Sequence, residues 1–257
     1  MVSLKEVFRT ELREYRAFRS LSLLVKAGKI QEKDKTKAIE LYERVIEMGE
    51  RVADAQLSLA YLIEKDDPER ADALYRAAVD SGEEDAPLLY GLFLADSGHL
   101  ERAKEMFELS VSRGDAEDAA ACLGAALMGE GGDRGRAREL LQSAREHHSV
   151  FAPLLLAQLA AEDGDRDAAV DYCEEAIKAG DPKAKAVLGL LVADEGDLER
   201  AKALLEEAIK DGDLERAPVF LADLLREEDA ARAIELYKVA IANGGERLAA
   251  SRLASMF

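Results

Sequence analysis

An alanine recurs along this chain at steps of 32 to 34 residues, and a glycine follows it at a fixed distance in all but one case. The repeated alanines are Ala38, Ala71, Ala103, Ala137, Ala169, Ala201 and Ala233. The residues eleven positions after them are Gly49, Gly82, Gly114, His148, Gly180, Gly212 and Gly244. A fixed period in this range is typical of arrays of helical hairpins. The spacing therefore predicts a repeat protein and argues against most enzymes.

The segment between each alanine and its glycine has the pattern of an amphipathic helix. In the first unit, apolar residues stand three, four, seven and eight positions after the alanine, at Leu41, Tyr42, Val45 and Ile46. These positions share one face of a helix, whereas a strand would alternate with a period of two. The glycine then falls where a helix ends, because glycine enters the left-handed conformation without steric penalty.

A second ladder of small residues predicts another helix in each unit. Its first members are Ala55, Ala86, Ala119, Ala152, Ala184, Ala217 and Ala249. The small residues five positions later are Ala60, Gly91, Gly124, Ala157, Gly189, Ala222 and Ala254. Glycine inside a helix costs about 1 kcal/mol relative to alanine, so its return here predicts close contact between helices. Each unit is thus predicted to be a pair of antiparallel helices.

These residues carry a family resemblance. The stretch from Lys37 to Tyr42, together with the Ala55 to Ala60 ladder, resembles the Sel-one-like branch of tetratricopeptide-type repeats. The run from Gly196 to Ala201 is similar to the hairpin turn of an ordinary tetratricopeptide repeat. The resemblance covers roughly residues 15–257, although most units lack the longer Sel-one-like turn and the chain has no tryptophan.

The resemblance implies an all-α fold, a right-handed α-solenoid or superhelix of about seven helix-turn-helix repeats of 32–34 residues. Residues 1–14 would form a basic N-terminal helix or arm, and residues 15–257 a single repeat domain. The family also implies an inner groove, lined by the first helix of each hairpin, that binds a peptide or another protein. Carried onto this chain, the groove places partner contacts at Asp54, Leu57, Tyr61, Asp85, Leu88, Leu92, Phe151, Leu154, Gln158, Arg216 and Arg226. The groove would be acidic at its N-terminal end, apolar in the middle and partly basic at its C-terminal end.

Charge is distributed unevenly along the chain. The net charge is −18, yet residues 1–37 hold ten Lys/Arg and five Asp/Glu, a net of +5. Arg9, Arg13 and Arg16 share one helix face in this segment, which predicts either a capping helix with arginines in solvent or an arm that docks on an acidic surface such as a second copy. The acidic remainder either keeps the array soluble or attracts a basic partner segment, and its field would repel nucleic acid.

Two segments depart from the repeat. In the fourth unit Arg145 replaces an apolar residue, and His147 and His148 replace the end of the helix and its glycine. This is either a tolerated irregularity or a contact point or hinge. A metal site is not expected, because adjacent histidines on a helix point about 100° apart. At the other departure, Met256 and Phe257 either fold against the preceding helices or contact another protomer or a partner.

Catalytic and targeting motifs are absent from the sequence. There is no G-x-x-x-x-G-K-[ST] loop and no H-E-x-x-H, and no cofactor is expected. No apolar run approaches the roughly 18 residues of a membrane span, and two cysteines favour a reducing cytoplasm. The sequence therefore predicts a non-catalytic protein-interaction scaffold or adaptor. The alternatives are a regulator or inhibitor acting through its acidic surface and a self-assembling structural protein.

Overall fold

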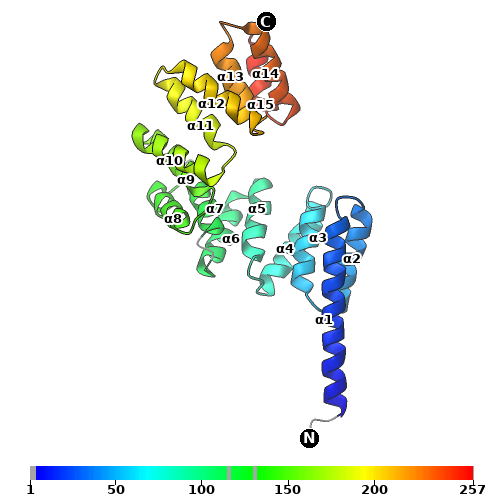
Figure 1. Ribbon diagram of the computed structural model, residues 1–257. Coiled ribbons are helices and arrows are strands. Elements are labelled where there is room, and N and C mark those ends of the chain that lie inside the picture. Colours follow the sequence, from blue (N-terminus) through cyan, green and yellow to red (C-terminus); the bar gives the residue numbers. More distant parts are fainter. Residues whose placement is uncertain (1–3, 115–116, 130–131, 257) are drawn as a thin grey trace. The chain divides into compact units, whose positions relative to one another are not determined.

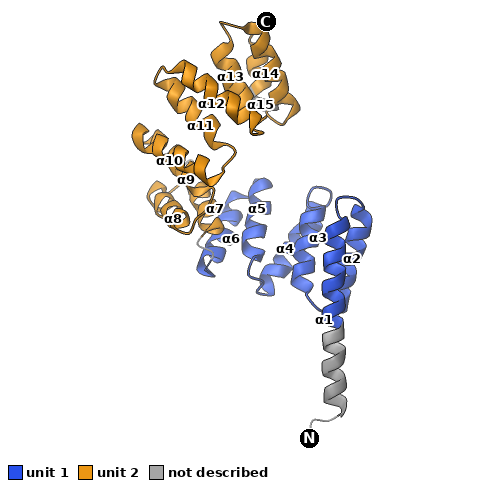
Figure 2. Ribbon diagram, in the orientation of Figure 1, with its two compact units in different colours: residues 1–115 blue, residues 116–257 orange. Residues whose placement is uncertain are grey.

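The computed structural model describes residues 4–114, 117–129 and 132–256, with the side chains of residues 4–15 and 246–248 outside the described set. Every regular element in this part of the chain is an α-helix (Figure 1). Contacts divide the chain into two compact units, residues 1–115 and 116–257, which Figure 2 colours separately. Each unit is an all-α stack of helical hairpins, as the sequence predicts.

Unit 1 contains the first six helices. They are α1 (Leu4–Ile30), α2 (Lys35–Met48), α3 (Val52–Ile63), α4 (Pro68–Asp80), α5 (Ala86–Asp96) and α6 (Leu100–Ser112). Contacts are densest in the pairs α1–α2, α3–α4 and α5–α6, and the pairs α2–α3 and α4–α5 join one hairpin to the next. Helix α1 runs without a break across residues 14 and 15, so the predicted arm continues directly into the helix that packs on α2.

Unit 2 continues the same pattern. Its helices are α7 (Asp118–Leu127), α8 (Arg134–Glu146), α9 (Ala152–Glu162), α10 (Arg166–Ala179), α11 (Ala184–Asp194), α12 (Leu198–Lys210), α13 (Ala217–Leu225), α14 (Ala230–Ala242) and α15 (Glu246–Ala254). Contacts are densest in the pairs α7–α8, α9–α10, α11–α12 and α13–α14. Helix α15 packs on α14.

Aspartates begin most of the second helices of the hairpins. Their carboxylates accept a backbone N–H from the third helical residue, which satisfies a donor that the helix leaves unpaired. The capping residues are Asp34, Asp67, Asp133, Asp165, Asp197 and Asp229. His99 takes this position at α6 and makes no side-chain cap. The first turn of α6 therefore lacks a contact that the equivalent helices have.

The small-residue ladder allows the two helices of a hairpin to approach closely. The seven alanines from Ala38 to Ala233 and the seven from Ala55 to Ala249 are fully buried. A Cβ built on Gly124 would lie 2.7 Å from Cγ of Leu141, and one built on Gly91 would lie 2.5 Å from the Phe107 ring. Such distances leave no space for a side chain. The predicted close contact between helices is therefore confirmed.

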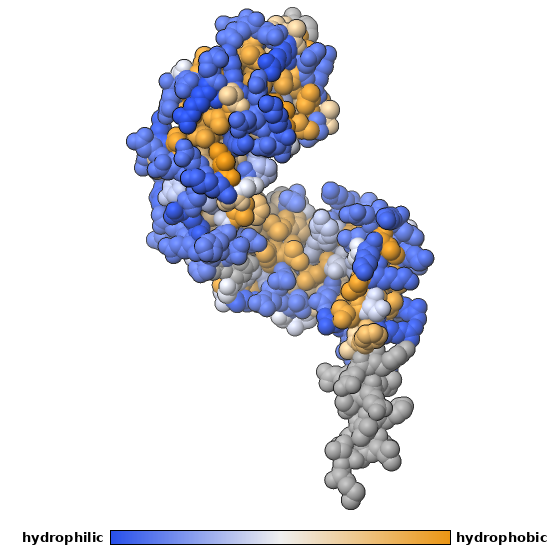
Figure 3. Space-filling view, in the orientation of Figure 1, coloured by the Kyte–Doolittle hydropathy of each residue, from blue (hydrophilic) through white to orange (hydrophobic). Residues whose placement is uncertain are grey.

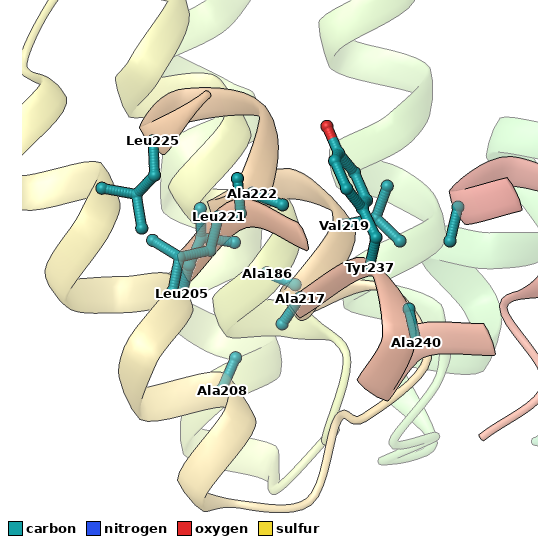
Figure 4. Packing of buried hydrophobic residues seen from close by; sticks show 12 residues of the cluster. Ala186, Leu205, Ala208, Ala217, Val219, Leu221, Ala222, Leu225, Tyr237 and Ala240 are labelled. Carbon is teal, nitrogen blue, oxygen red and sulfur yellow. The ribbon is translucent and has the colours of Figure 1, made fainter. Parts of the chain in front are cut away.

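The same layering forms the core at the end of unit 2. Figure 4 shows Leu205, Val219 and Leu221 among small alanines from α11 to α14, with the Tyr237 ring beside them. The Tyr237 hydroxyl points away from the aliphatic side chains (Figure 4). Leu253 and Met256 pack against this cluster from the chain's last turns. Met256 therefore folds against its own unit, and Phe257 lies outside the described residues.

Candidate functional site

Two exposed apolar side chains mark the face of the first helices in unit 1. Tyr61 on α3 is 66% exposed and Leu92 on α5 is 41% exposed. Each stands six residues after a buried ladder alanine, Ala55 or Ala86, so the two occupy the same position in consecutive hairpins. Unpaired aromatic and aliphatic side chains at matching positions form a surface that can contact a ligand.

A cavity of about 270 Å³ lies at the C-terminal ends of these two helices. It is lined by Glu64, Lys65, Phe93, Asp96 and Ser97. Because successive helical turns lie three or four residues apart, Glu64 and Asp96 are each one turn beyond Tyr61 or Leu92. We call Tyr61, Leu92 and this cavity the α3/α5 face.

A second cavity of about 330 Å³ shares Phe93 and Ser97 with the first. Its other lining residues are Pro68, Glu69, Asp72, His99 and Arg102. His99 is thus both the residue that breaks the capping pattern and a residue that lines a cavity. His99 was not among the predicted site residues, although the substitution of histidine for a recurring aspartate was a readable signal.

Stacked aromatic rings support the floor of the α3/α5 face. The Phe93 ring lies 5.2 Å from that of Tyr75 and 6.3 Å from that of Tyr90, between centroids. The Tyr75 hydroxyl donates to Glu64 at 2.9 Å. Burial, together with Glu64, raises the pKa of Tyr75 well above its ordinary value, so this donor stays protonated at neutral pH. Glu64 is therefore fixed in place by the core beneath it.

A polar network holds the other side of Phe93. Tyr90 donates to Asp72 at 2.7 Å, and the Arg102 guanidinium lies 5.7 Å from the Tyr90 ring centroid. Burial alone would raise the pKa of Asp72, but the hydrogen bonds from Tyr90 and Arg102 lower it below its ordinary range. Asp72 is therefore ionised at neutral pH, and its charge is balanced by ion pairs with Arg76 and Arg102.

Acidic side chains dominate the charge around the α3/α5 face. Asp85 and Asp96 are exposed, and Asp54 is half-buried with a weak 3.4 Å ion pair to Arg51. Among the cavity residues, Lys65 is the basic side chain beside Glu64 and Asp96. The arrangement suits a ligand that offers an apolar group together with a positive charge.

Two of the predicted groove residues lie in the core instead. Leu57 is 9% exposed and Leu154 is 5% exposed, and Leu154 packs against Ala184 and Leu188 of the following hairpin. These leucines therefore support the face from below, and we leave them out of the contact surface. Leu88 is half-buried on α5.

The predicted contacts in unit 2 are dispersed. Phe151 is 55% exposed just before α9, and Gln158 is half-buried on the same helix. Arg216 is exposed, whereas Arg226 donates to the backbone oxygen and hydroxyl of Ser255, both at 3.0 Å. Because these residues belong to a different unit from Tyr61 and Leu92, the polarity gradient of the groove stays a prediction.

The irregular fourth unit is braced by its arginine. Arg145 Nε lies 2.8 and 2.9 Å from the two carboxylate oxygens of Glu175, and its guanidinium carbon is 5.6 Å from the Tyr172 ring centroid. The side chain thus joins α8 to α10 where an apolar residue would pack. His147 Nδ1 lies 2.8 Å from the Ser143 carbonyl oxygen. His148 has φ +68°, the left-handed conformation that glycine adopts at the equivalent positions.

Replacing His148 by glycine should raise the free energy of unfolding by roughly 0.5–1 kcal/mol, because glycine adopts positive φ without strain. The urea midpoint, followed by circular dichroism, measures the change. Gly180→Ala is the matched control at an equivalent helix end with φ +87°, and it should lose about 1 kcal/mol. A fall in the midpoint of His148→Gly would show that the imidazole itself stabilises this turn.

Tyr237 makes unit 2 sensitive to alkali. Its hydroxyl donates to Asp223 at 2.6 Å, and Asp223 also pairs with Arg252. Burial, together with Asp223, raises the pKa of Tyr237 to about 12. The unfolded chain releases this proton near pH 10, so the contribution to stability is complete below pH 10 and is lost between pH 10 and 12.

Because Tyr237→Phe lacks the hydroxyl and its hydrogen bond, its free energy of unfolding at pH 8 should be about 1 kcal/mol below that of the wild type. Between pH 8 and pH 11 the variant's free energy of unfolding should then fall by less than that of the wild type. Urea midpoints at the two pH values measure both effects. Tyr61→Phe, at an exposed ring, should retain the wild-type decline. An unchanged decline in Tyr237→Phe would contradict the assignment.

The remaining predicted contacts lie near the N-terminus. The side chains of Arg9 and Arg13 are outside the described set, and Arg16 is exposed on α1.

Within the described residues no three His, Cys, Asp or Glu side chains are grouped as a metal ion would require. In the same part of the chain, no helix combines the length and apolarity needed to cross a membrane.

Solved structures with the same hairpin architecture are tetratricopeptide and Sel-one-like repeat proteins. A tetratricopeptide repeat protein from Parabacteroides merdae is 18% identical with a TM-score of 0.72, covering 92% of this chain and 98% of that one. A protective antigen of uropathogenic Escherichia coli with an SLR fold is 19% identical with a TM-score of 0.64, covering 93% and 56%. Yeast Tom70 is 19% identical with a TM-score of 0.66, covering 97% and 57%.

The chain therefore has the fold of a tetratricopeptide-like helical repeat protein. It spans just over half the length of the E. coli and yeast chains that it matches. No model of a protein family and no curated protein sequence matches it.

Proposed function

We propose that this protein is a non-catalytic interaction scaffold or adaptor that binds a segment of a partner protein on the α3/α5 face. The observation that carries the proposal is the pair of exposed apolar side chains, Tyr61 and Leu92, at matching positions beside an acidic cavity. Large aromatic side chains that become buried on binding contribute much of the energy of protein interfaces.

The chemistry of the face defines the segment that it would bind. An apolar side chain of the ligand would cover Tyr61 and Leu92, while a lysine or arginine would enter the cavity beside Glu64 and Asp96. The aromatic cluster under the cavity and the hydrogen bond from Tyr75 hold Glu64 in position before binding. A preorganised site loses less conformational entropy on binding than a mobile one.

The double substitution Tyr61→Glu and Leu92→Glu tests the proposal. Tagged wild-type and variant chains are used to capture partners from an extract of the source cells, and the captured proteins are quantified by mass spectrometry. A partner of the α3/α5 face should be captured at least tenfold less by the variant, because a loss of about 1.4 kcal/mol already lowers affinity tenfold. Because the site is acidic, capture should also weaken as salt concentration rises.

Leu100→Glu and Leu198→Glu are matched controls, since both leucines are exposed and lie outside the α3/α5 face. Both controls should capture partners as the wild type does, and all variants should keep the wild-type circular dichroism spectrum. If the double variant captures the same partners in the same amounts, the proposed site is wrong. If the controls lose the partner equally, the effect comes from added charge rather than from the site.

A further inference from the structure

Helix α1 exposes an apolar stripe in its described part. Phe18 is 73% exposed, Leu21 is 42% exposed and Val25 is 49% exposed. Their spacing of three and four residues places them on one face of the helix. Figure 3 shows hydrophobic atoms at the surface over this part of α1. The opposite face packs on α2, where Ser20 and Ala27 are fully buried.

The repeat register identifies what kind of surface this stripe is. Ala27 lies fifteen residues before the buried Tyr42, as Ala60 lies fifteen before the buried Tyr75. In this register Ser22 corresponds to the ladder alanine Ala55, which is fully buried in the hairpin whose first helix packs on α2. Ser22 is exposed. In the same register Phe18, Leu21 and Val25 correspond to Arg51, Asp54 and Ser58, which are exposed or half-buried. The stripe therefore places apolar side chains where the next hairpin has polar ones.

Charge beside the stripe restricts what can cover it. Residues 16–30 contain Arg16, Arg19, Lys26 and Lys29 and no acidic residue. Two copies meeting through this face would bring four lysines together, Lys26 and Lys29 of each copy, which disfavours self-association. Among the described residues, no other helix has a comparable stripe of exposed large apolar side chains with which a second copy of the chain could pair. A complementary partner must bring both apolar groups and negative charge.

We propose that the outer face of α1 docks an acidic amphipathic helix of a partner protein, which packs on Phe18, Leu21 and Val25. The docked helix presents apolar residues three and four positions apart and carboxylates toward Lys26 and Lys29. This site is separate from the α3/α5 face, which suits a basic ligand, so the two sites can hold two different partner segments.

A synthetic helical peptide tests the proposal directly. The probe is a fluorescently labelled peptide with leucines spaced three and four residues apart, alanines for helix propensity and glutamates elsewhere. A second peptide replaces each glutamate by lysine. Fluorescence anisotropy with the full chain should give saturable binding of the glutamate peptide and at least tenfold weaker binding of the lysine peptide, with the preference decreasing at high salt.

Substitutions on the face assign the binding to α1. Val25→Glu and Phe18→Ser should each weaken binding of the glutamate peptide at least tenfold. Leu100→Glu, at another exposed leucine of unit 1, should leave binding unchanged. Because all three side chains are exposed, the variants should keep the wild-type circular dichroism spectrum and melting temperature.

Three results would overturn the proposal. Equal affinity for the two peptides would contradict the requirement for an acidic partner. The absence of saturable binding would contradict the existence of a docking site on α1. A wild-type dimer in sedimentation equilibrium that Val25→Glu dissociates and Leu100→Glu does not would assign the face to a second copy. A failure of the partner-capture test of the α3/α5 face would not affect this test, since neither peptide experiment uses Tyr61 or Leu92.

Discussion

Gly124→Val is expected to lower the free energy of unfolding by about 3 kcal/mol. A Cβ at this position would already lie 2.7 Å from Cγ and 2.9 Å from Cδ2 of Leu141, and 3.3 Å from the carbonyl oxygen of Ala137. Leu141 is fully buried and the carbonyl belongs to the α8 backbone, so neither can move without disturbing the hairpin. Valine adds two methyl groups to that collision. Urea unfolding followed by circular dichroism measures the loss.

Ala125→Val is the matched control on the next residue of α7. Ala125 stands six positions after the ladder alanine Ala119, where the equivalent residues in unit 1 are the exposed Tyr61 and Leu92. This position therefore accepts a larger side chain, and the control should change stability by less than about 0.5 kcal/mol. If both substitutions destabilise equally, the cause is β-branching in a helix rather than contact with Leu141.

A paired substitution separates collision from helix propensity. In the next hairpin the same two positions hold Ala157 and Cys173, both fully buried in one cluster. Gly124→Ala combined with Leu141→Cys copies this smaller pair. The double variant should be at least 0.5 kcal/mol more stable than the sum of the two single losses predicts, because the new methyl group fills space that the leucine leaves. Strict additivity would mean that the two positions do not touch.

These contacts show why so much of the fold could be predicted from the sequence. The repeated alanines and glycines lie within single hairpins, so the requirement for close approach recurs in the sequence each time the structure needs it. The residues four and seven positions after each alanine are buried for the same reason, as Tyr75 and Ala78 illustrate. Because the same local packing recurs in every repeat, the sequence has a periodic pattern of small and apolar residues, and that pattern predicted the helices.

The site was harder to predict because its exposure depends on the neighbouring hairpin. Leu154 occupies a groove position by register, yet Ala184 and Leu188 from α11 cover it. The cavity beside Phe93 depends on the ends of two helices from different hairpins. Neither contact leaves a pattern within one repeat. His99 was the available signal, since it departs from the capping aspartate at the edge of that cavity.

Cys173 is expected to react with Ellman's reagent roughly 1000-fold more slowly than an ordinary thiol at pH 8. Its side chain is fully buried on α10, and burial, together with the charge of Asp181, raises the pKa of the thiol to about 12 from an ordinary 9.0. Only the thiolate attacks a disulfide, so the reactive fraction falls by about three orders of magnitude. The measurement uses Cys122→Ser, in which Cys173 is the remaining cysteine.

The same chain in about 6 M guanidinium chloride is the control, and its thiol should react at the ordinary rate once the hairpin is unfolded. Reaction in native buffer at a comparable rate would show that Cys173 is accessible and would contradict its place in the core. Slow labelling makes this thiol a probe of local opening, because the hairpin α9–α10 must open before the reagent can enter.

That probe also measures how far a defect spreads along the array. Each hairpin contacts mainly its neighbours, so stability is close to a sum of local and nearest-neighbour terms. Gly124→Val loosens the hairpin α7–α8, which contacts α9 directly, and should accelerate Cys173 labelling at least tenfold. Ala222→Val places a valine at the corresponding ladder position of α13, beyond the hairpin α11–α12, and should accelerate labelling much less. Equal acceleration by the two variants would mean that unit 2 opens as one cooperative body rather than hairpin by hairpin.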